Sequence, residues 1–254
     1  MNDASTVLEP PSGHKKARQN RINHLDLAYE RIEQLIVTCE LAPGRELSLQ
    51  DLQTLTGYGR TPVHHAVNRL SHDTLIIIRP RHGLRIAPID LSRERLLLDL
   101  RRNLERFVIE LATQRSSASH RNRMLHLSRT LRLRRDEMGI DEFNEIDRRI
   151  DQLFLTAAGE PFVEHTLRPL HTMFRRTGWL YHRHMPESAD LKVTIDLHLA
   201  VLDAVAHGRV AAALQESDAL IAFVGTMFDD LEAHIDPSLL DTSIEPLIGF
   251  QHPD

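Results

Sequence analysis

The stretch that begins at Ser48 constrains the fold of this chain more than any other, because cap and turn residues stand there at fixed offsets. Ser48 is a good N-cap residue, and Asp51, three positions later, provides an acidic form of the capping box. Gly57 predicts the end of the helix, since helices commonly close at a glycine. These residues predict one short helix, whose buried face would consist of Leu49, Leu52 and Leu55.

A second short helix is predicted after a tight turn. Thr61 would be its N-cap, and Pro62 would take the first helical position, where a missing N–H costs nothing. Apolar residues then recur at helical spacing, with polar or basic residues between them. The inward residues are Val63, Ala66, Val67 and Leu70, and the remaining ones are Arg60, His64, His65, Asn68 and Arg69.

Two β-branched runs complete this unit. Residues 75–78 and 84–86 flank a basic turn that contains a glycine, a pattern typical of a hairpin. Helix, turn, helix and hairpin in this order predict a winged helix-turn-helix. The second helix suits the donor and acceptor pattern of the DNA major groove, and the basic hairpin tip suits phosphate or the minor groove. The predicted DNA contacts are Arg60, Thr61, His64, His65, Arg69, His82 and Gly83.

The rest of the chain is helical in character. Apolar residues recur there at spacings of three and four, without a strand pattern or an internal repeat. About six or seven antiparallel helices of this length would form a bundle, with an interior cavity as a ligand site. The first of these helices is expected to bury Leu97, Leu100, Leu104, Phe107, Val108 and Leu111.

These patterns predict a mainly α fold, with an N-terminal winged helix-turn-helix and a C-terminal all-α bundle. The first residues lack apolar periodicity, as disordered tails do, and proline, glycine and aspartate return near the C-terminus. We therefore predict a disordered tail at 1–20, the winged domain at 21–90, the bundle at 91–235 and a loosely held tail at 236–254.

The net charge of −5 disfavours DNA binding, because phosphate contacts need a basic face. The acidic excess lies outside the winged domain, however, since residues 21–90 hold eight arginines against eight Asp or Glu. Cys39 is the only cysteine, so no intrachain disulfide is possible and a cytoplasmic setting is expected. No apolar run approaches the roughly 20 residues of a membrane span, so no membrane partner is expected.

The winged segment resembles the GntR family of bacterial transcription regulators. The match is specific, because turn chemistry, cap chemistry and core spacing agree together. The family usually has Arg-Glu where this chain has His64-His65, and that arginine contacts DNA in relatives. The matching positions are Leu41, Pro43-Gly44, Leu47-Ser48, Leu52, Gly57, Arg60-Thr61-Pro62-Val63, Ala66 and Leu70, and His82-Gly83 matches the family's wing contact.

The second half resembles the FCD ligand-binding domain of the FadR-like branch of that family. Many members hold a divalent metal with an Asp, a His one helical turn later and two further His. Asp147 and His198 match two of these positions, but Asp151 replaces the first His and Leu220 the last. The resemblance therefore leaves open a weak site for a hard ion at Asp147, Asp151 and His198, or no metal. The matching residues are Leu100-Arg101, Leu104-Glu105, Asp147, Ala157-Ala158-Gly159, Pro161, His198, Leu202-Asp203-Ala204 and His207-Gly208.

An acidic effector would be recognised best by arginine, because a guanidinium pairs with a carboxylate at two points. Arg101 matches a family position, while Arg102, Arg175 and Arg176 are further candidates with surface salt bridges as the alternative. The dense histidines at 165–184 favour a solvated cluster over a site. The expected effector-binding residues are Arg101, Asp147, Asp151 and His198.

No catalytic arrangement stands out, since the chain has no G-x-S-x-G, no glycine-rich phosphate loop and no H-E-x-x-H. We therefore expect a regulator and not an enzyme. The expectation is a homodimeric repressor that binds a two-fold double-stranded DNA operator and is released by a small-molecule effector. The resemblance implies an organic acid as that effector, while the loss of the family histidine at Leu220 leaves an uncharged or aromatic effector open. The alternative is a helical-bundle metal-dependent enzyme, or a ligand-binding protein, with an appended winged domain.

Overall fold

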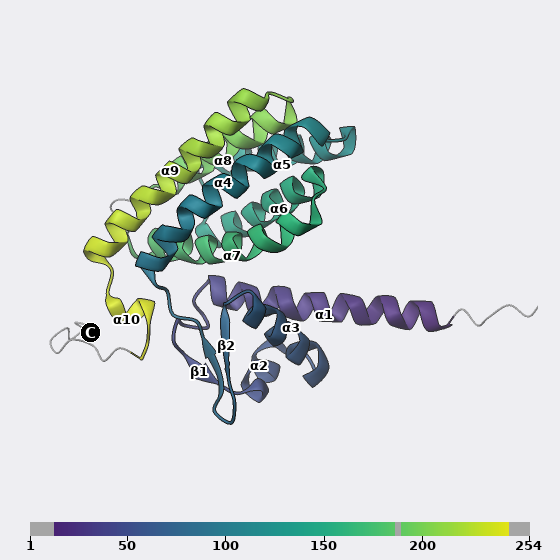
Figure 1. Cartoon of the computed structure of the whole chain (residues 1–254), viewed down its shortest axis with the longest axis vertical. Helices are drawn as coiled ribbons and strands as arrows, with labels where there is room; N and C mark the ends of the chain where they lie inside the picture. The colour runs from purple at the N-terminus through teal and green to yellow at the C-terminus, as the bar shows by residue number, and fades with distance from the viewer. Residues whose placement is uncertain (1–12, 186–188, 244–254) are drawn as a thin grey trace, which may run out of the picture.

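The computed structural model describes residues 13–185 and 189–243, with the backbone alone for residues 13–23. Two apolar cores lie one above the other in Figure 1. One is built from residues between Ala28 and Ile86, and the other from residues between Ile89 and Leu231. The described chain therefore forms two domains whose cores change over just before residue 90.

The N-terminal domain combines helices with a small sheet. All strand pairs are antiparallel and the strand order is β1-β3-β2, so β3 lies in the middle. The β2–β3 hairpin points away from the bundle as a wing (Figure 1), which confirms the predicted winged helix-turn-helix. The helices are α1 (Gly13–Val37), α2 (Leu49–Thr56) and α3 (Arg60–His72), and the strands are β1 (Glu46–Leu47), β2 (Ile76–Arg79) and β3 (Gly83–Ile86).

Helix α2 begins and ends at the capping residues that the sequence predicted. Ser48 and Asp51 form the capping box, and Gly57 ends the helix in the left-handed region at a φ of 74°. The buried face is narrower than expected. Leu52 is fully buried, but Leu55 is 46% exposed, because a helix this short turns only one of its leucines into the core.

The start of α3 differs from the prediction. Its N-cap is Gly59, and the helix begins at Arg60, so Thr61 already lies inside the first turn and caps nothing. Glycine is an acceptable N-cap when its backbone is extended, as here. The predicted inward face is confirmed, because the buried residues of α3 are Val63, Ala66, Val67 and Leu70.

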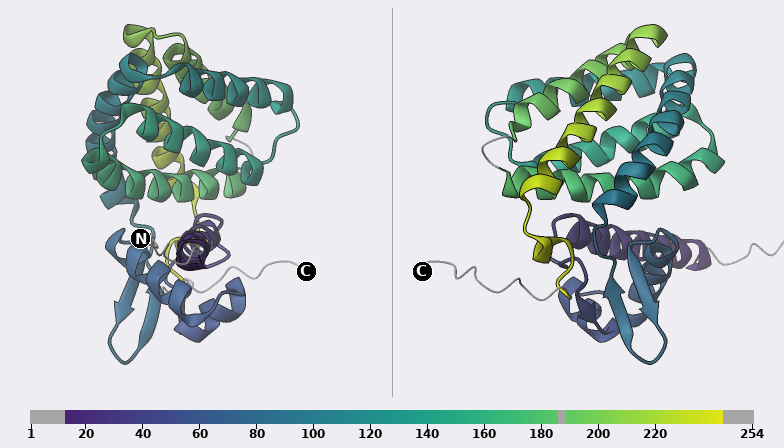
Figure 2. Two further views of the ribbon diagram at one scale, coloured as in Figure 1. Left: turned by 90° about the vertical axis from the view of Figure 1, so that its right-hand side faces the viewer. Right: turned by 60° about the vertical axis from the view of Figure 1, so that its left-hand side comes forward.

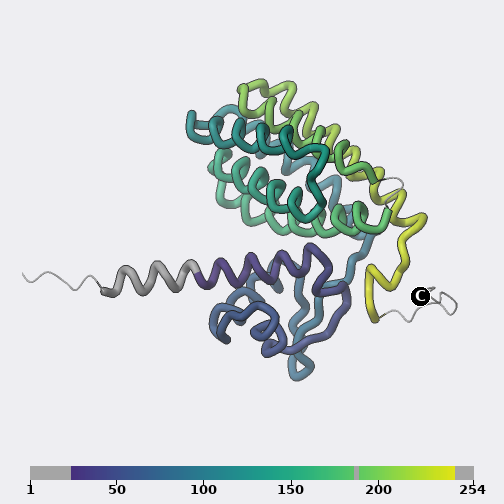
Figure 3. The backbone as a smooth tube through the Cα atoms, turned by 180° about the vertical axis from the view of Figure 1, so that it is seen from behind, coloured from purple at the N-terminus to yellow at the C-terminus, as the bar shows by residue number. Residues whose placement is uncertain are grey.

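The C-terminal domain is the predicted all-α bundle. α4 packs along α9, α5 along α8 and α6 along α7, while α7 also faces α1 of the other domain (Figures 1 and 3). Among the described helices, α9 is long and apolar enough to span a membrane by length and composition, but it packs along α4 and α8. The helices are α4 (Leu91–Arg115), α5 (Ala118–Arg134), α6 (Ile140–Ala158), α7 (Pro161–His184), α8 (Leu191–Ala206) and α9 (Val210–His234).

Helix α4 presents a different face from the expected one. Of the residues predicted to be buried, Leu100 and Phe107 are 45% and 48% exposed, and only Val108 is fully buried. The inward face lies beside the leucine stripe and carries three charged residues, Glu94, Arg101 and Glu105. Its buried members include Leu98, Arg101, Glu105, Val108, Ile109 and Ala112.

Both predicted tails are shorter than expected. Helix α1 begins at Gly13, inside the segment 1–20 that was expected to be disordered, and residues 1–12 lie outside the described part. At the other end, the predicted tail 236–254 includes helix α10 (Pro237–Leu240), and residues 244–254 lie outside the described part.

The segment after α9 returns to the N-terminal domain (Figure 2). The backbone N–H of Ile89 donates to Leu240 O at 2.9 Å, and the N–H of Thr242 donates to Pro43 O at 2.9 Å. Arg85 of β3 donates from Nη2 to both carboxylate oxygens of Asp241, each at 2.9 Å. The segment that was expected to be loose is therefore bonded to the winged domain up to residue 243.

Candidate functional site

The exposed side of α3 forms the candidate DNA-reading face. Arg60, Thr61, His64 and His65 all lie open to solvent there, because residues three or four apart share a helix face. His64 Nδ1 lies 3.3 Å from the side-chain nitrogen of Asn68. Within the described chain Arg60 makes no hydrogen bond or ion pair, so its guanidinium is available to a partner.

Arg69 has a different environment from the rest of this face. Its Nη1 lies 2.9 Å from Asp26 Oδ1 of α1, and its guanidinium carbon lies 4.0 Å from the ring centroid of Tyr29. The Tyr29 hydroxyl in turn donates to Asp73 at 2.9 Å. Arg69 therefore joins α3 to α1, a role that periodicity alone did not separate from DNA contact.

The wing tip is shaped by left-handed backbone. Arg81 and His82 are exposed at the tip, and Arg81 has a φ of 69°. Gly83 follows with a φ of 87°, and a Cβ there would lie 2.9 Å from Leu47 O. The sheet therefore requires glycine at this position, whether or not the wing contacts DNA.

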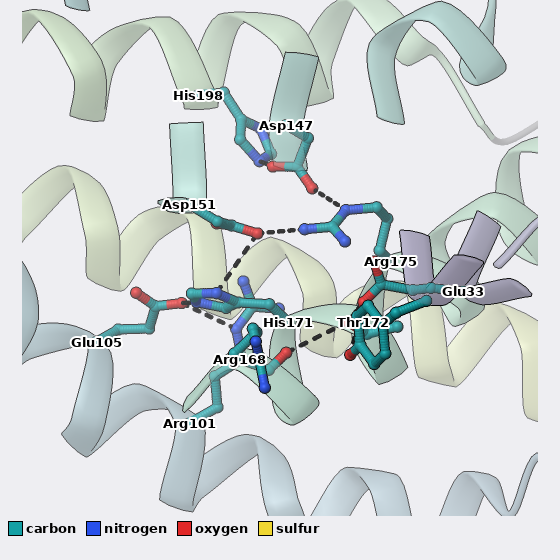
Figure 4. Close-up of polar contacts among 11 residues, drawn as sticks. Glu33, Arg101, Glu105, Asp147, Asp151, Arg168, His171, Thr172, Arg175 and His198 are labelled. Atoms are coloured by element: carbon teal, nitrogen blue, oxygen red, sulfur yellow. Dashed lines mark hydrogen bonds and ion pairs between the residues drawn. The ribbon is translucent and has the colours of Figure 1, made fainter. Parts of the chain in front are cut away.

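The centre of the bundle holds a group of charged and titratable side chains from four helices (Figure 4). Their side chains are between 4% and 15% exposed. Three of the four helices each supply two residues four positions apart, since such positions lie one above the other on one face, and α8 supplies one residue. This buried charge cluster consists of Arg101 and Glu105 from α4, Asp147 and Asp151 from α6, His171 and Arg175 from α7, and His198 from α8.

Arg175 bridges the two aspartates of the cluster. Its Nε donates to Asp147 Oδ2 at 2.9 Å, and its Nη2 donates to Asp151 Oδ2. The other oxygen of Asp147 lies 3.1 Å from His198 Nε2. Burial raises the pKa of Asp147, but Arg175 and His198 outweigh burial and hold it well below its usual range. Burial and the charge of Asp147 instead raise the pKa of Asp151.

Glu105 binds the other half of the cluster. Its Oε1 lies 2.7 Å from His171 Nε2 and accepts a 3.1 Å hydrogen bond from Arg101 Nε. Burial raises the pKa of Glu105, but His171 and Arg101 together bring it down to about 2. Arg101 Cζ also lies 5.0 Å from the ring centroid of Phe174. Its two Nη atoms have no hydrogen-bond partner in the described chain, so they remain available to a ligand.

Two small cavities border these free donors. They measure about 50 and 20 Å³, and Arg101, His198 and Leu220 line both of them. Asn144 lines the larger one, and its side-chain nitrogen is buried without a hydrogen-bond partner. The larger cavity is lined by residues of α4, α6, α7, α8 and α9, so a ligand there would contact all of these helices.

A wider cleft of about 270 Å³ lies between the domains and reaches the cluster from the side of α1. Thr172 of α7 crosses this junction by donating its hydroxyl to Glu33 Oε1 of α1 at 2.6 Å. Helix α7 therefore carries residues of the cluster and residues of the domain contact. The cleft is lined by Tyr29, Glu33 and Arg69 from the N-terminal domain and by Asp151, Arg168 and His171 from the bundle, among others.

A second buried charge lies at the domain border. Glu94 of α4 accepts a hydrogen bond from the Thr177 hydroxyl, and burial raises the pKa of Glu94 from 4.5 to about 7. Arg176 beside it is 2% exposed, and its Nε and Nη2 have no hydrogen-bond partner in the described chain. Sequence analysis named Arg176 as a candidate for recognising an acidic effector, with a surface salt bridge as the alternative, and the structure buries it away from the surface.

The four predicted effector residues, Arg101, Asp147, Asp151 and His198, meet in one place. Sequence analysis missed Glu105 and His171, and it underrated Arg175 as a surface residue. Arg102 is exposed and pairs with Asp99 at 3.2 Å. Of the histidines at 165–184, His165 and His184 are exposed as expected, His182 is half-buried, and His171 is the exception. A sequence signal for these residues was available: charged residues recur four positions apart in segments that also carry apolar residues at helical spacing.

Two family models match this chain. Residues 26–86 match that of the bacterial regulatory proteins of the gntR family, and residues 96–223 match that of the FCD domain. An uncharacterized HTH-type transcriptional regulator in an unstable DNA locus of Streptomyces ambofaciens is 25% identical over 212 residues, 84% of this chain and 86% of that protein. The HTH-type transcriptional repressor RspR of Escherichia coli strain K12 is 25% identical over 174 residues, 68% of this chain and 76% of that protein.

Solved structures show the same fold. McbR/YncC of E. coli matches with a TM-score of 0.71 at 14% identity, over 82% of this chain and 98% of that one. A putative transcriptional regulator GntR from Rhodococcus sp. RHA1 matches with a TM-score of 0.59 at 17% identity, over 86% of this chain and 99% of that one. At such identities the likeness extends to the fold alone.

Proposed function

The chain belongs to the GntR family of bacterial regulatory proteins and carries its FCD domain, and from this premise we propose that it is a repressor released by a small carboxylate-bearing metabolite. Membership makes the chain a DNA-binding transcription regulator, and the prediction of a regulator rather than a metal-dependent enzyme is thereby confirmed. The repressor role and the control by a metabolite are the parts proposed.

The DNA half of the proposal rests on the exposed face of α3. Arg60, Thr61, His64 and His65 would reach base edges in the major groove, and His82 would contact phosphate from the wing. Arg69 and Gly83 would act indirectly, Arg69 by fixing α3 on α1 and Gly83 by shaping the wing. Replacing Arg60 with alanine is expected to weaken operator binding by about 1–3 kcal/mol.

The effector half rests on one observation: Arg101, whose two Nη atoms have no hydrogen-bond partner in the described chain, lines both inner cavities, where the aspartates are already paired with Arg175. Two unpaired carboxylates would repel an acid, but Arg175 bonds both Asp147 and Asp151. Asn144 adds a second buried donor without a partner. A carboxylate of the ligand would thus complete hydrogen bonds that the protein leaves unmade.

The lining of the larger cavity supports a route for the signal. A metabolite bound there would contact α7, which contributes several of the lining residues. Helix α7 holds α1 through Thr172 and Glu33, and α1 holds the recognition helix through Arg69. Effector binding would therefore change the placement of α3 relative to the bundle.

We further propose a homodimer in the cytoplasm. One winged domain covers only about 600–1,000 Å² of DNA, so two copies on a two-fold operator are needed for high specificity. The outward apolar residues of α4, Leu100 and Phe107, would suit contact with a second copy. Light scattering at micromolar concentration tests this, and a monomer with and without DNA contradicts it.

Footprinting with DNA from around the protein's own gene, beside a thermal-shift screen of organic acids, tests the proposal. We expect protection of a two-fold site that an acid relieves, with Arg101→Ala keeping the operator and losing the response to the acid. Arg168→Ala is the matched control, because Arg168 lines the cleft between the domains and not the inner cavities. Stabilisation by neutral compounds alone, or a response lost only in Arg168→Ala, contradicts an acid at Arg101.

A further inference from the structure

The residues that the resemblance assigns to a divalent ion lie together, but their donor atoms are already used. Nε and Nη2 of Arg175 bond one carboxylate oxygen each of Asp147 and Asp151, the type of atom that a hard cation binds. His198 directs Nε2 at the second oxygen of Asp147, while its Nδ1 lies 2.7 Å from Thr194 O. Figure 4 shows the guanidinium between the two aspartates.

The position of the last histidine in the family's metal site offers no donor atom in this chain. Leu220 lines both inner cavities together with His198, so its side chain faces the same space but is apolar. Within the part of the chain whose side chains are described, no group of three or more His, Cys, Asp or Glu is placed to hold an ion. The residues present therefore do not fit a divalent metal.

The negative charges of Asp147 and Asp151 explain why a positive group is needed between them. Carboxylates buried as deeply as Asp147 and Asp151 are costly unless a positive charge neutralises them. Arg175 supplies that charge from α7, and its side chain is 5% exposed. An entering metal ion would have to expel this guanidinium, which would then be a buried charge without a partner.

We propose that Arg175 is a covalently attached substitute for the divalent cation, so that the wild-type chain holds this cluster together without metal. The proposal does not depend on the identity of the effector. Its failure would leave operator binding and effector binding as they stand.

The test titrates the full-length chain and its variants with Mn²⁺ alone, by calorimetry and by thermal unfolding. Leu220→His adds a donor but keeps the guanidinium, whereas Arg175→Ala/Leu220→His adds the donor and frees the aspartates. We expect no saturable binding to the wild type or Leu220→His. The double variant is expected to bind about one Mn²⁺ per chain saturably, with an unfolding midpoint that rises with Mn²⁺ and falls again in EDTA.

Arg102→Ala/Leu220→His is the matched control, because it removes an exposed arginine and should behave like Leu220→His. Saturable binding of Mn²⁺ to the wild type that is lost in His198→Ala overturns the proposal. A folded double variant that binds no better than Leu220→His also overturns it. If the double variant does not fold, the wild type decides: a midpoint unchanged by EDTA supports the substitution, and one that EDTA lowers and Mn²⁺ restores overturns it.

Discussion

The interior of the winged domain is almost entirely apolar, whereas the bundle encloses the buried charge cluster at its centre. Apolar packing stabilises a domain without requiring a particular orientation of its groups, since the hydrophobic effect is roughly proportional to the apolar area buried. Buried charges contribute little net stability even when paired, because desolvation offsets their attraction. The first interior is therefore held together by apolar packing, whereas the second depends on the pairing of its charges.

Removing Arg175 should show the largest effect, because it leaves two buried aspartates without their cation. Arg175→Met is expected to destabilise the bundle by about 3–5 kcal/mol. Trp179, the only tryptophan, lies in α7, so its fluorescence in a urea titration reports bundle unfolding. Arg102→Met, which removes an exposed pair, should cost less than about 1 kcal/mol. Equal losses of stability in the two variants would mean that Arg175 does not hold the buried charge cluster together.

The apolar interior of the winged domain allows the reverse comparison. Leu52→Ala opens a cavity in a fully buried site and should cost about 2–5 kcal/mol, whereas the same change at half-exposed Leu55 should cost less than about 0.5 kcal/mol. Amide hydrogen exchange resolved by peptide measures the winged domain separately from the bundle. If both changes cost the same, α2 does not pack as described.

Glu94 extends the comparison to pH. Its pKa in the folded chain is raised from 4.5 to about 7, so its contribution to stability is full below pH 4.5 and is lost as the pH rises through 7. The loss amounts to about 3 kcal/mol at most. Glu94→Gln keeps the carbonyl that can accept from Thr177 and should reduce the loss of the bundle's stability between pH 5 and 8, leaving the part that comes from Asp151. An unchanged pH profile in this variant would show that Glu94 is not the titrating group.

The contact between Arg85 and Asp241 should give the smallest effect. Burial raises the pKa of Asp241, but hydrogen bonds from Ser243 and Arg85 bring it below its usual range. Asp241→Asn weakens a partly exposed pair and is expected to cost about 1 kcal/mol. Hydrogen exchange in β3 should rise, while exchange in α8 stays constant as the internal control. Protection of β3 that does not change would make this contact incidental.

How far the sequence alone predicts this molecule depends on the range of the interactions. Ser48, Asp51 and Gly57 act on neighbours within one short helix, and the winged unit was therefore predictable together with its wing. The first turn of α3 was misread, because Gly59 could cap in place of Thr61, and the buried face of α2 was predicted too wide at Leu55.

The cluster could be predicted only in part, because its contacts join distant parts of the chain. Asp147 and His198 came from the resemblance, whereas the partnership of Asp147 with Arg175 depends on how α6 lies against α7. On α4, the apolar periodicity pointed to Leu100 and Phe107, and the helix instead turned Arg101 and Glu105 inward. Apolar periodicity predicts burial from hydrophobic residues alone. It cannot predict a helix face whose charged residues are buried because they pair with charges on other helices.

Because residues 241–243 return to the winged domain, this domain is attached to the bundle at two places. One is the segment before α4, and the other is the segment after α9. A domain joined by one linker alone can rotate in many directions, whereas the hydrogen bond between Ile89 and Leu240 fastens the returning segment beside that linker and restricts the rotation. If α7 moved, as proposed for effector binding, the winged domain would therefore have few directions in which to follow it.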